Sequence, residues 1–175
     1  MIYKLLPNTD KILHTPTQPF DFSNPPCDPI QLIEDLKDTM QEYNGIGLSA
    51  NQVDMPFNNL SVCVIGNPSD RKSIIGLFNP KIVDTFGDKT YMVEGCLSYP
   101  GLTFKVKRFE NIRVRFSNEK GETNTTIFRG ITSRIIQHEC DHLNGKTFIY
   151  AGTKFHVDQA YRKLKYINRH KKLFK

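Results

Sequence analysis

The five residues His138-Glu139-Cys140-Asp141-His142 form an HExxH pattern, which can hold a metal ion and place a carboxylate beside it. On a helix the two histidines lie about 40° from alignment on one face, so a single metal can bind both. Glu139 is rotated by about 100° from His138 and can take a proton from metal-bound water. The pattern predicts a metal-dependent hydrolase, with a chance match on a surface helix as the alternative.

A catalytic metal site needs a third protein ligand and one position left open for water. No glutamate follows Glu139, and Phe148 occupies the position at which metzincins carry a third histidine. Three later residues with suitable side chains stand at no recognised spacing: His156, Asp158 and His170. The downstream sequence therefore offers no clear third ligand.

Cys96 is an upstream candidate for that ligand. It follows a glycine in VEGCLSYPG and precedes a Ser-Tyr-Pro-Gly turn, where a backbone can bend to meet a metal. The alternative is an inert core cysteine. Among the other cysteines, Cys63 lies in the apolar run LSVCVIG and Cys140 points away from the two histidines. With no CxxC pair present, we do not expect a disulfide framework.

Two predicted helices would position these residues. The HExxH pattern falls in a helix expected at about residues 131–143, closed by Asn144-Gly145. An earlier helix begins at Asp28-Pro29-Ile30-Gln31, which offers an N-cap, a proline at the first position and a capping-box partner. It ends at Asn44-Gly45 and leads into the loop GIGLSANQ, residues 45–52.

Between residues 60 and 129 the apolar residues fall in short segments typical of β-strands. These are LSVCVIG, IIGLFNPKIVDTF, IRVRF and TTIF, separated by NPSD, FGDK and SNEKGE. A basic helix or tail follows at about residues 156–175. We expect an α+β fold in which antiparallel strands pack around a central metal-binding HExxH helix, with an N-terminal and a C-terminal helix.

Size and composition favour one soluble globular domain spanning residues 1–175. Hydrophobic residues make up 38% of the chain and charged residues 24%, and no stretch approaches the roughly 18 apolar residues of a membrane span. The first residues resemble neither a secretory signal nor a transit peptide. We therefore expect a cytoplasmic protein without membrane attachment.

Three separated segments match the motifs of one family in order and spacing. GIGLSANQ, EGCLS and QHECDHLNG resemble the three motifs of peptide deformylases, and the similarity runs from the first helix past Gly145. Two residues depart from the first motif, Ser49 where alanine is usual and Asn51 where proline is common. We expect neither to have a role.

The resemblance implies a reaction and the groups that perform it. Metal-bound water attacks the formyl carbonyl of N-terminal formyl-methionine on newly made polypeptides, and formate is released. Glu139 acts as general base and then acid, while the Gln52 side chain and the Leu97 backbone N–H stabilise the oxyanion. The metal ligands implied are Cys96, His138 and His142. One divalent metal is expected per chain, natively ferrous iron (Fe²⁺), with zinc, nickel or cobalt as replacements.

Substrate contacts are expected from residues of the same three motifs and the helix before the third. They are Gly45, Ile46, Gly47, Glu94, Gly95, Ile131 and Ile135. The two loop glycines would let a substrate backbone approach closely, and the three isoleucines would line a pocket for methionine. A helix C-cap and ordinary core packing are the respective alternatives. Arg108 and Asp141 would orient the ligands, or form a solvated ion pair.

The predicted partners are N-formylmethionyl nascent peptides and, through the basic tail, ribosomal RNA. Seven cationic residues follow Asp158 without an acidic one: Arg162, Lys163, Lys165, Arg169, Lys171, Lys172 and Lys175. A solvated charged face is the alternative. We expect a monomer without sequence-specific nucleic-acid binding, in a bacterium or in the bacterial host of a virus. A general metallopeptidase and a nucleic-acid-binding module with a structural metal remain competing functions.

Overall fold

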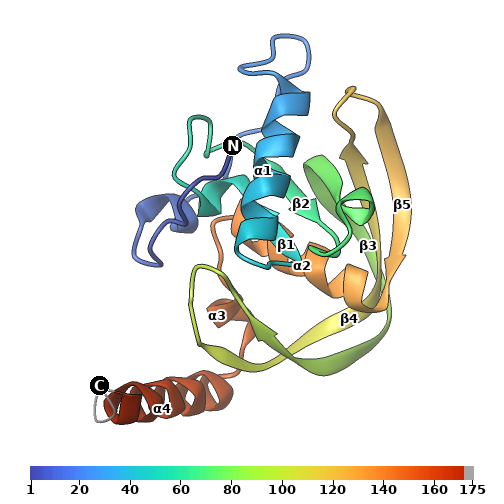
Figure 1. Cartoon of the computed structure of the whole chain (residues 1–175). Helices are drawn as coiled ribbons and strands as arrows, with labels where there is room; N and C mark the ends of the chain where they lie inside the picture. Colours follow the sequence, from blue (N-terminus) through green and yellow to red (C-terminus); the bar gives the residue numbers. More distant parts are fainter. Residues whose placement is uncertain (172–175) are drawn as a thin grey trace.

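The computed structural model describes residues 1–171, so Lys172 and Lys175 of the basic tail lie outside the described residues. Within this range five strands form one antiparallel sheet in the order β1-β2-β3-β4-β5 (Figure 1). The strands are β1 (Gly47–Ser49), β2 (Val62–Ile65), β3 (Ile75–Gly95), β4 (Thr103–Ser117) and β5 (Thr123–Arg129). The helices are α1 (Pro29–Glu42), α2 (Gly130–Leu143), α3 (Phe148–Ala151) and α4 (Lys154–Lys171), with short 3-10 turns at Lys11–His14, Ala50–Gln52 and Arg71–Ser73. The predicted α+β class is confirmed.

Helix α1 begins as its sequence predicts, but one detail differs. The Asp28 side chain accepts a hydrogen bond from the Ile30 N–H at 2.9 Å. Gln31 does not complete a capping box, because its amide donates to Asp35 one turn later, at 2.8 Å. Asn44, in the left-handed region at φ 51°, ends the helix and leads into β1.

The β3–β4 hairpin is longer than the sequence suggested. FGDK was expected to separate strands, but β3 continues through it, with a register shift between the pairs of Phe86 and Lys89. Gly87, at φ 76°, supplies the backbone freedom that such an irregularity needs. A bulge therefore replaces the turn, and pairing runs on to Gly95 and Thr103, where the chain turns at Cys96.

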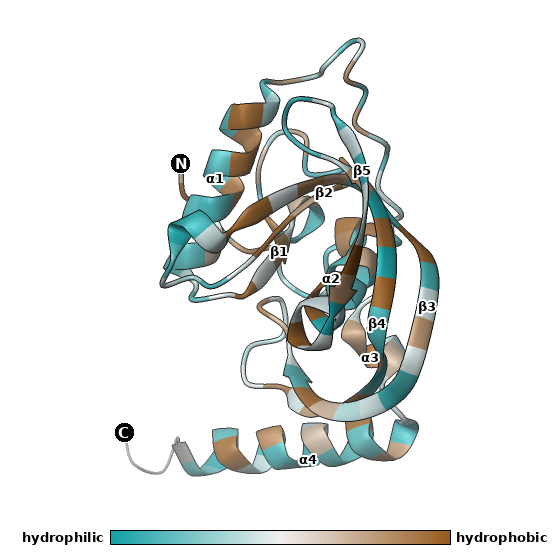
Figure 2. Cartoon of the chain, turned by 90° about the vertical axis from the view of Figure 1, so that its right-hand side faces the viewer, coloured by the Kyte–Doolittle hydropathy of each residue, from teal (hydrophilic) through white to brown (hydrophobic). Residues whose placement is uncertain are grey.

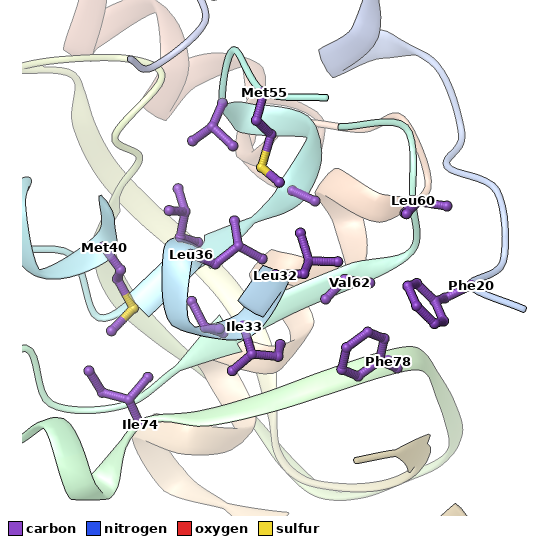
Figure 3. Packing of buried hydrophobic residues seen from close by; sticks show 14 residues of the cluster. Phe20, Leu32, Ile33, Leu36, Met40, Met55, Leu60, Val62, Ile74 and Phe78 are labelled. Atoms are coloured by element: carbon purple, nitrogen blue, oxygen red, sulfur yellow. The ribbon is translucent and has the colours of Figure 1, made fainter. Parts of the chain in front are cut away.

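Helices α1 and α2 pack on opposite faces of the sheet. Because successive strand residues point to opposite faces, Val62 and Val64 pack with α1, while Cys63 and Ile65 pack with α2. Figure 3 shows the first cluster, in which Leu32, Ile33, Leu36 and Met40 of α1 lie over Val62, Ile74 and Phe78. Burial of each large side chain contributes about 1.5–3 kcal/mol. These two packed layers hold β1 and α2, which carry the site, in fixed relation.

Helix α4 lies along one end of the molecule (Figures 1 and 2). Its Ala160 and Leu164 pack with Leu102, Phe104 and Phe148. Polar and apolar residues alternate along the helix in Figure 2, and its aromatic residues Phe155, Tyr161 and Tyr166 are exposed. No helix in the part of the chain that the structure describes is both long and apolar enough to cross a membrane.

Candidate active site

Three side chains from two segments converge at the predicted metal position. Cys96 follows the end of β3, whereas His138 and His142 lie one turn apart on α2. Their ligand atoms all lie within 4.8 Å of one another, and Cys96 Sγ is 3.2 Å from His142 Nε2. Bonds of about 2.0–2.3 Å to a tetrahedral metal place its donors roughly 3.5 Å apart. The donor set therefore fits one divalent metal with a position left open.

The buried state of His142 suits a metal ligand. Burial, together with the positive charge of Arg108, lowers the pKa of His142 well below its ordinary value, so its imidazole is neutral. Cys140, between the histidines in sequence, instead packs with Cys63 in the core under α2, as expected from helix geometry. Burial raises the pKa of the Cys140 thiol to about 12, which leaves it inert.

Glu94 contacts His138 and two buried arginines. Its carboxylate lies 3.2 Å from His138 Nδ1, 2.8 and 3.0 Å from Arg108 Nε and Nη2, and 2.6 Å from Arg134 Nη1. Burial opposes its ionisation, but the hydrogen bonds from His138 and Arg108 lower the pKa of Glu94 to about 2. The carboxylate is therefore placed to orient His138, and because Glu94 also lines the cavity, its predicted substrate contact stays a prediction.

Arg108 links this carboxylate to the end of the HExxH segment. Its Nη1 lies 2.8 Å from Asp141 Oδ2, and the guanidinium is only 6% exposed, which excludes the alternative of a solvated pair for Arg108. Besides Glu94, Arg134 donates hydrogen bonds to the Val106 and Thr90 carbonyls. The sequence motifs did not predict a role for Arg134. It lies four residues before His138, on the same helix face, so the i, i+4 spacing could have revealed it.

Glu139 is held between two residues of β1. Its Oε2 accepts a 2.6 Å hydrogen bond from Ser49 Oγ. A Cβ at Gly47 would overlap Oε1 and lie 2.8 Å from Ile135 Cγ2, so any side chain there would have to displace Glu139 and Ile135. At Gly45 a Cβ would come within 2.8 Å of Leu97 Cδ1. Burial raises the pKa of Glu139, although the Ser49 hydrogen bond and the charge of Arg108 lower it in part.

Gln52 is fixed at both ends of its amide. Its Oε1 accepts from the Ser49 N–H at 2.9 Å, and its Nε2 donates to Ser98 Oγ at 3.1 Å and to Cys96 Sγ at 3.5 Å. Ser98, which is buried, had no role in the sequence analysis. The Gln52 donor therefore points to the sulfur that the metal would share.

A cavity of about 990 Å³ opens onto these groups. Ile46 and Ile131 on its wall are about half exposed, as expected for a mouth open to solvent. All seven residues predicted to contact substrate line it: Gly45, Ile46, Gly47, Glu94, Gly95, Ile131 and Ile135. So do Gln52, Cys96, Leu97, His138 and Glu139. Arg108, Asp141 and His142 are not part of this wall and lie behind it.

A family model described as polypeptide deformylase matches residues 2–156. The chain belongs to this family. A curated peptide deformylase of Aquifex aeolicus is 38% identical over 152 residues, which cover 85% of this chain and 86% of that protein. A crystal structure of a Legionella pneumophila peptide deformylase has a TM-score of 0.81 at 33% identity and covers 98% of each chain. A Synechococcus elongatus peptide deformylase in complex with actinonin also has a TM-score of 0.81, at 33% identity, covering 92% and 85%. The resemblance carried by the three motifs is confirmed.

The two residues that depart from the deformylase motif both contact the HExxH segment, although nothing in the sequence indicated this. Ser49 donates to the Glu139 carboxylate, and Asn51 Nδ2 donates to the His142 carbonyl at 2.7 Å. These partners lie 90 and 91 residues away along the chain. A motif read along the sequence could not reveal contacts of that separation.

Proposed function

We propose that residues 1–175 form a single catalytic domain that removes the N-terminal formyl group from formyl-methionine of newly made polypeptides and releases formate. One observation carries the proposal. In a chain of the deformylase family, the donor atoms of Cys96, His138 and His142 lie within 4.8 Å of one another, and Cys96, His138 and Glu139 line one open cavity.

Cys96, His138 and His142 would hold one divalent metal, natively ferrous iron, with zinc, nickel or cobalt as replacements. Such a metal supplies Lewis acidity, polarising the formyl carbonyl and lowering the pKa of water. Glu94 keeps His138 oriented, and Arg108 and Asp141 hold Glu94 and the end of α2 in place.

Glu139 moves the proton. Its carboxylate accepts one proton from the attacking water and then donates it to the departing amine, so that formate and a free N-terminus are released. The developing negative charge on the formyl oxygen is stabilised by Gln52 Nε2 and the Leu97 backbone N–H. One donor of this kind contributes about 2.7–4 kcal/mol to lowering the barrier.

The cavity accommodates the start of a formylated peptide. Ile46, Ile131 and Ile135 line its wall and receive the methionine side chain, while the loop at Gly45 and Gly47 faces the peptide backbone. The apolar residues and Glu139 line the same cavity, which favours an apolar N-terminal residue placed beside the catalytic carboxylate.

Helix α4 is the proposed contact with the ribosome. Four of its cationic side chains are exposed: Arg162, Lys163, Lys165 and Arg169. Such a face binds phosphate backbones by releasing their counterions. The protein acts as a monomer in the cytoplasm of a bacterium or of a virus's bacterial host. Co-sedimentation with ribosomes that persists unchanged after truncation at Asp158 contradicts this part of the proposal.

The test is formate release from formyl-Met-Ala-Ser by anaerobically prepared protein loaded with ferrous iron. Glu139→Ala is expected to lose at least about 100-fold in kcat while retaining its metal. Glu110→Ala, an exposed change on β4, is the matched control and should keep the parent rate. No release by fully loaded parent protein, together with cleavage of unblocked peptides, would instead favour a general metallopeptidase.

A further inference from the structure

Glu139 owes its orientation to a residue outside the metal ligands. We propose that Ser49 is a positioning residue that fixes the Glu139 carboxylate, leaving Oε1 as the oxygen that exchanges the proton. This inference rests on the proposed function and adds a specific division of labour between the two carboxylate oxygens.

The hydrogen bond between Ser49 and Glu139 is short and buried. Ser49 is fully buried and Glu139 is 3% exposed, and 2.6 Å separates Ser49 Oγ from Glu139 Oε2. Within residues 1–171, Ser49 is the only residue that donates a hydrogen bond to this carboxylate. Hydroxyl-to-carboxylate bonds of this length are roughly twice as strong as those between neutral groups.

In this chain the Ser49 hydroxyl adds a constraint on the carboxylate plane that an alanine at this position cannot supply. The terminal torsion of glutamate is broad and roughly two-fold, so packing of the aliphatic part alone does not select one orientation. The Ser49 hydroxyl selects it by holding one oxygen. A catalytic base must lie within about 2.6–3.2 Å of the proton it accepts, so a rotated carboxylate loses reach.

The other oxygen lies against a residue with no side chain. Oε1 occupies the space that a Cβ at Gly47 would fill, and Gly47 and Glu139 both line the cavity. Oε2 is committed to Ser49, whereas Oε1 accepts no hydrogen bond from the residues that the structure describes. The two oxygens are thus distinguished by their neighbours, and Oε1 is the one left for the reaction.

Ser49 also contacts the proposed oxyanion donor. Its backbone N–H donates to Gln52 Oε1, and its hydroxyl, which donates to Glu139, also pairs with the Gln52 backbone N–H in a capping box. Ser49→Ala therefore removes the contact with Glu139 and the side-chain half of the capping box, while the backbone contact that holds the Gln52 side chain remains. The substitution takes away one oxygen atom and adds nothing to the packed interior.

Ser133→Ala provides a matched control. Ser133 is equally buried, lies on α2, and donates its hydroxyl to the Phe109 carbonyl at 3.1 Å. Both variants lose one buried hydroxyl, but only Ser49→Ala loses a contact with Glu139. Comparing them separates positioning of the carboxylate from general destabilisation.

The experiment measures kcat, KM, bound metal and the unfolding temperature of the three proteins, together with crystal structures of the parent and Ser49→Ala. We expect Ser49→Ala to lower kcat about tenfold, with KM within twofold and metal content unchanged, and to show the Glu139 carboxylate in more than one orientation. Ser133→Ala should keep kcat within about twofold.

An unchanged kcat in Ser49→Ala, or a fall that merely follows loss of metal, overturns the proposal. Parent protein that releases no formate refutes the proposed function instead. In that case the crystal structures still decide, because a carboxylate held identically in both proteins excludes a positioning role for Ser49.

Discussion

Replacing Glu94 with glutamine tests whether its carboxylate orients a ligand or contacts the substrate. Glutamine keeps the shape of the side chain but removes the charge that Arg108, Arg134 and His138 share. Arg134 then remains buried without its counterion, and Arg108 keeps only Asp141. Breaking a buried ion pair in this way costs about 3–5 kcal/mol.

The pKa of Glu94 gives an independent magnitude. Lowering it from 4.5 to about 2 corresponds to roughly 3 kcal/mol of stabilisation by the ionised form. Because the folded pKa lies below the unfolded one, this stabilisation is complete above about pH 4.5 and is lost as the pH falls toward 2. The difference in stability between parent and Glu94→Gln should therefore shrink to less than half of its neutral value by about pH 3.

Urea denaturation at pH 7 and at pH 3 measures the free energy of unfolding, and competition with a chelator measures metal affinity. We expect Glu94→Gln to unfold at lower urea and to bind metal about 10–100-fold more weakly, since His138 loses its negatively charged hydrogen-bond acceptor. Glu110→Gln, exposed on the same hairpin, is the control. Unchanged stability and metal affinity with a raised KM would falsify the orienting role and favour the substrate contact expected from the sequence.

Three further changes probe the site. Gly47→Ala should lower kcat more than tenfold with metal retained, because the new Cβ displaces Glu139 Oε1; formate release at the parent rate would contradict this close approach. Cys96→Ala should lose its metal on dialysis, since one of three donors is gone, and metal analysis showing full occupancy would rule out that ligand. Asn51→Ala should cost about 1 kcal/mol in urea denaturation, because the His142 carbonyl loses its donor; an unchanged midpoint would show that this hydrogen bond adds no net stability.

Local patterns predicted the elements that carry the site. The period of α2, the Asp28 N-cap of α1 and the antiparallel strands all follow from neighbours within a few residues, and the structure contains each of them. The β3 bulge was not predictable in this way. FGDK has the composition of a turn, and only pairing with β4 decides that the strand continues.

The long-range contacts explain what the sequence analysis missed. Ser49 and Asn51 form hydrogen bonds with residues of α2. Glu94 forms ion pairs with Arg108 of β4 and Arg134 of α2. No local sequence spacing predicts any of these pairs. The position of Arg134 on the same helix face as His138 could nevertheless be predicted, because the two residues are four positions apart in the sequence.

The site residues lie far apart in the sequence, and this separation determines at which stage of folding the site can form. The contact between Ser49 and Glu139 closes a loop of 90 residues, and that between Cys96 and His142 a loop of 46. Closing such loops has an entropy cost that only the packed sheet and helices repay. No fragment that ends before α2 can bind the metal as the whole protein does, so uptake of metal reports completed folding. An enzyme proposed to act on unfinished chains thus becomes competent only when its own chain is nearly finished.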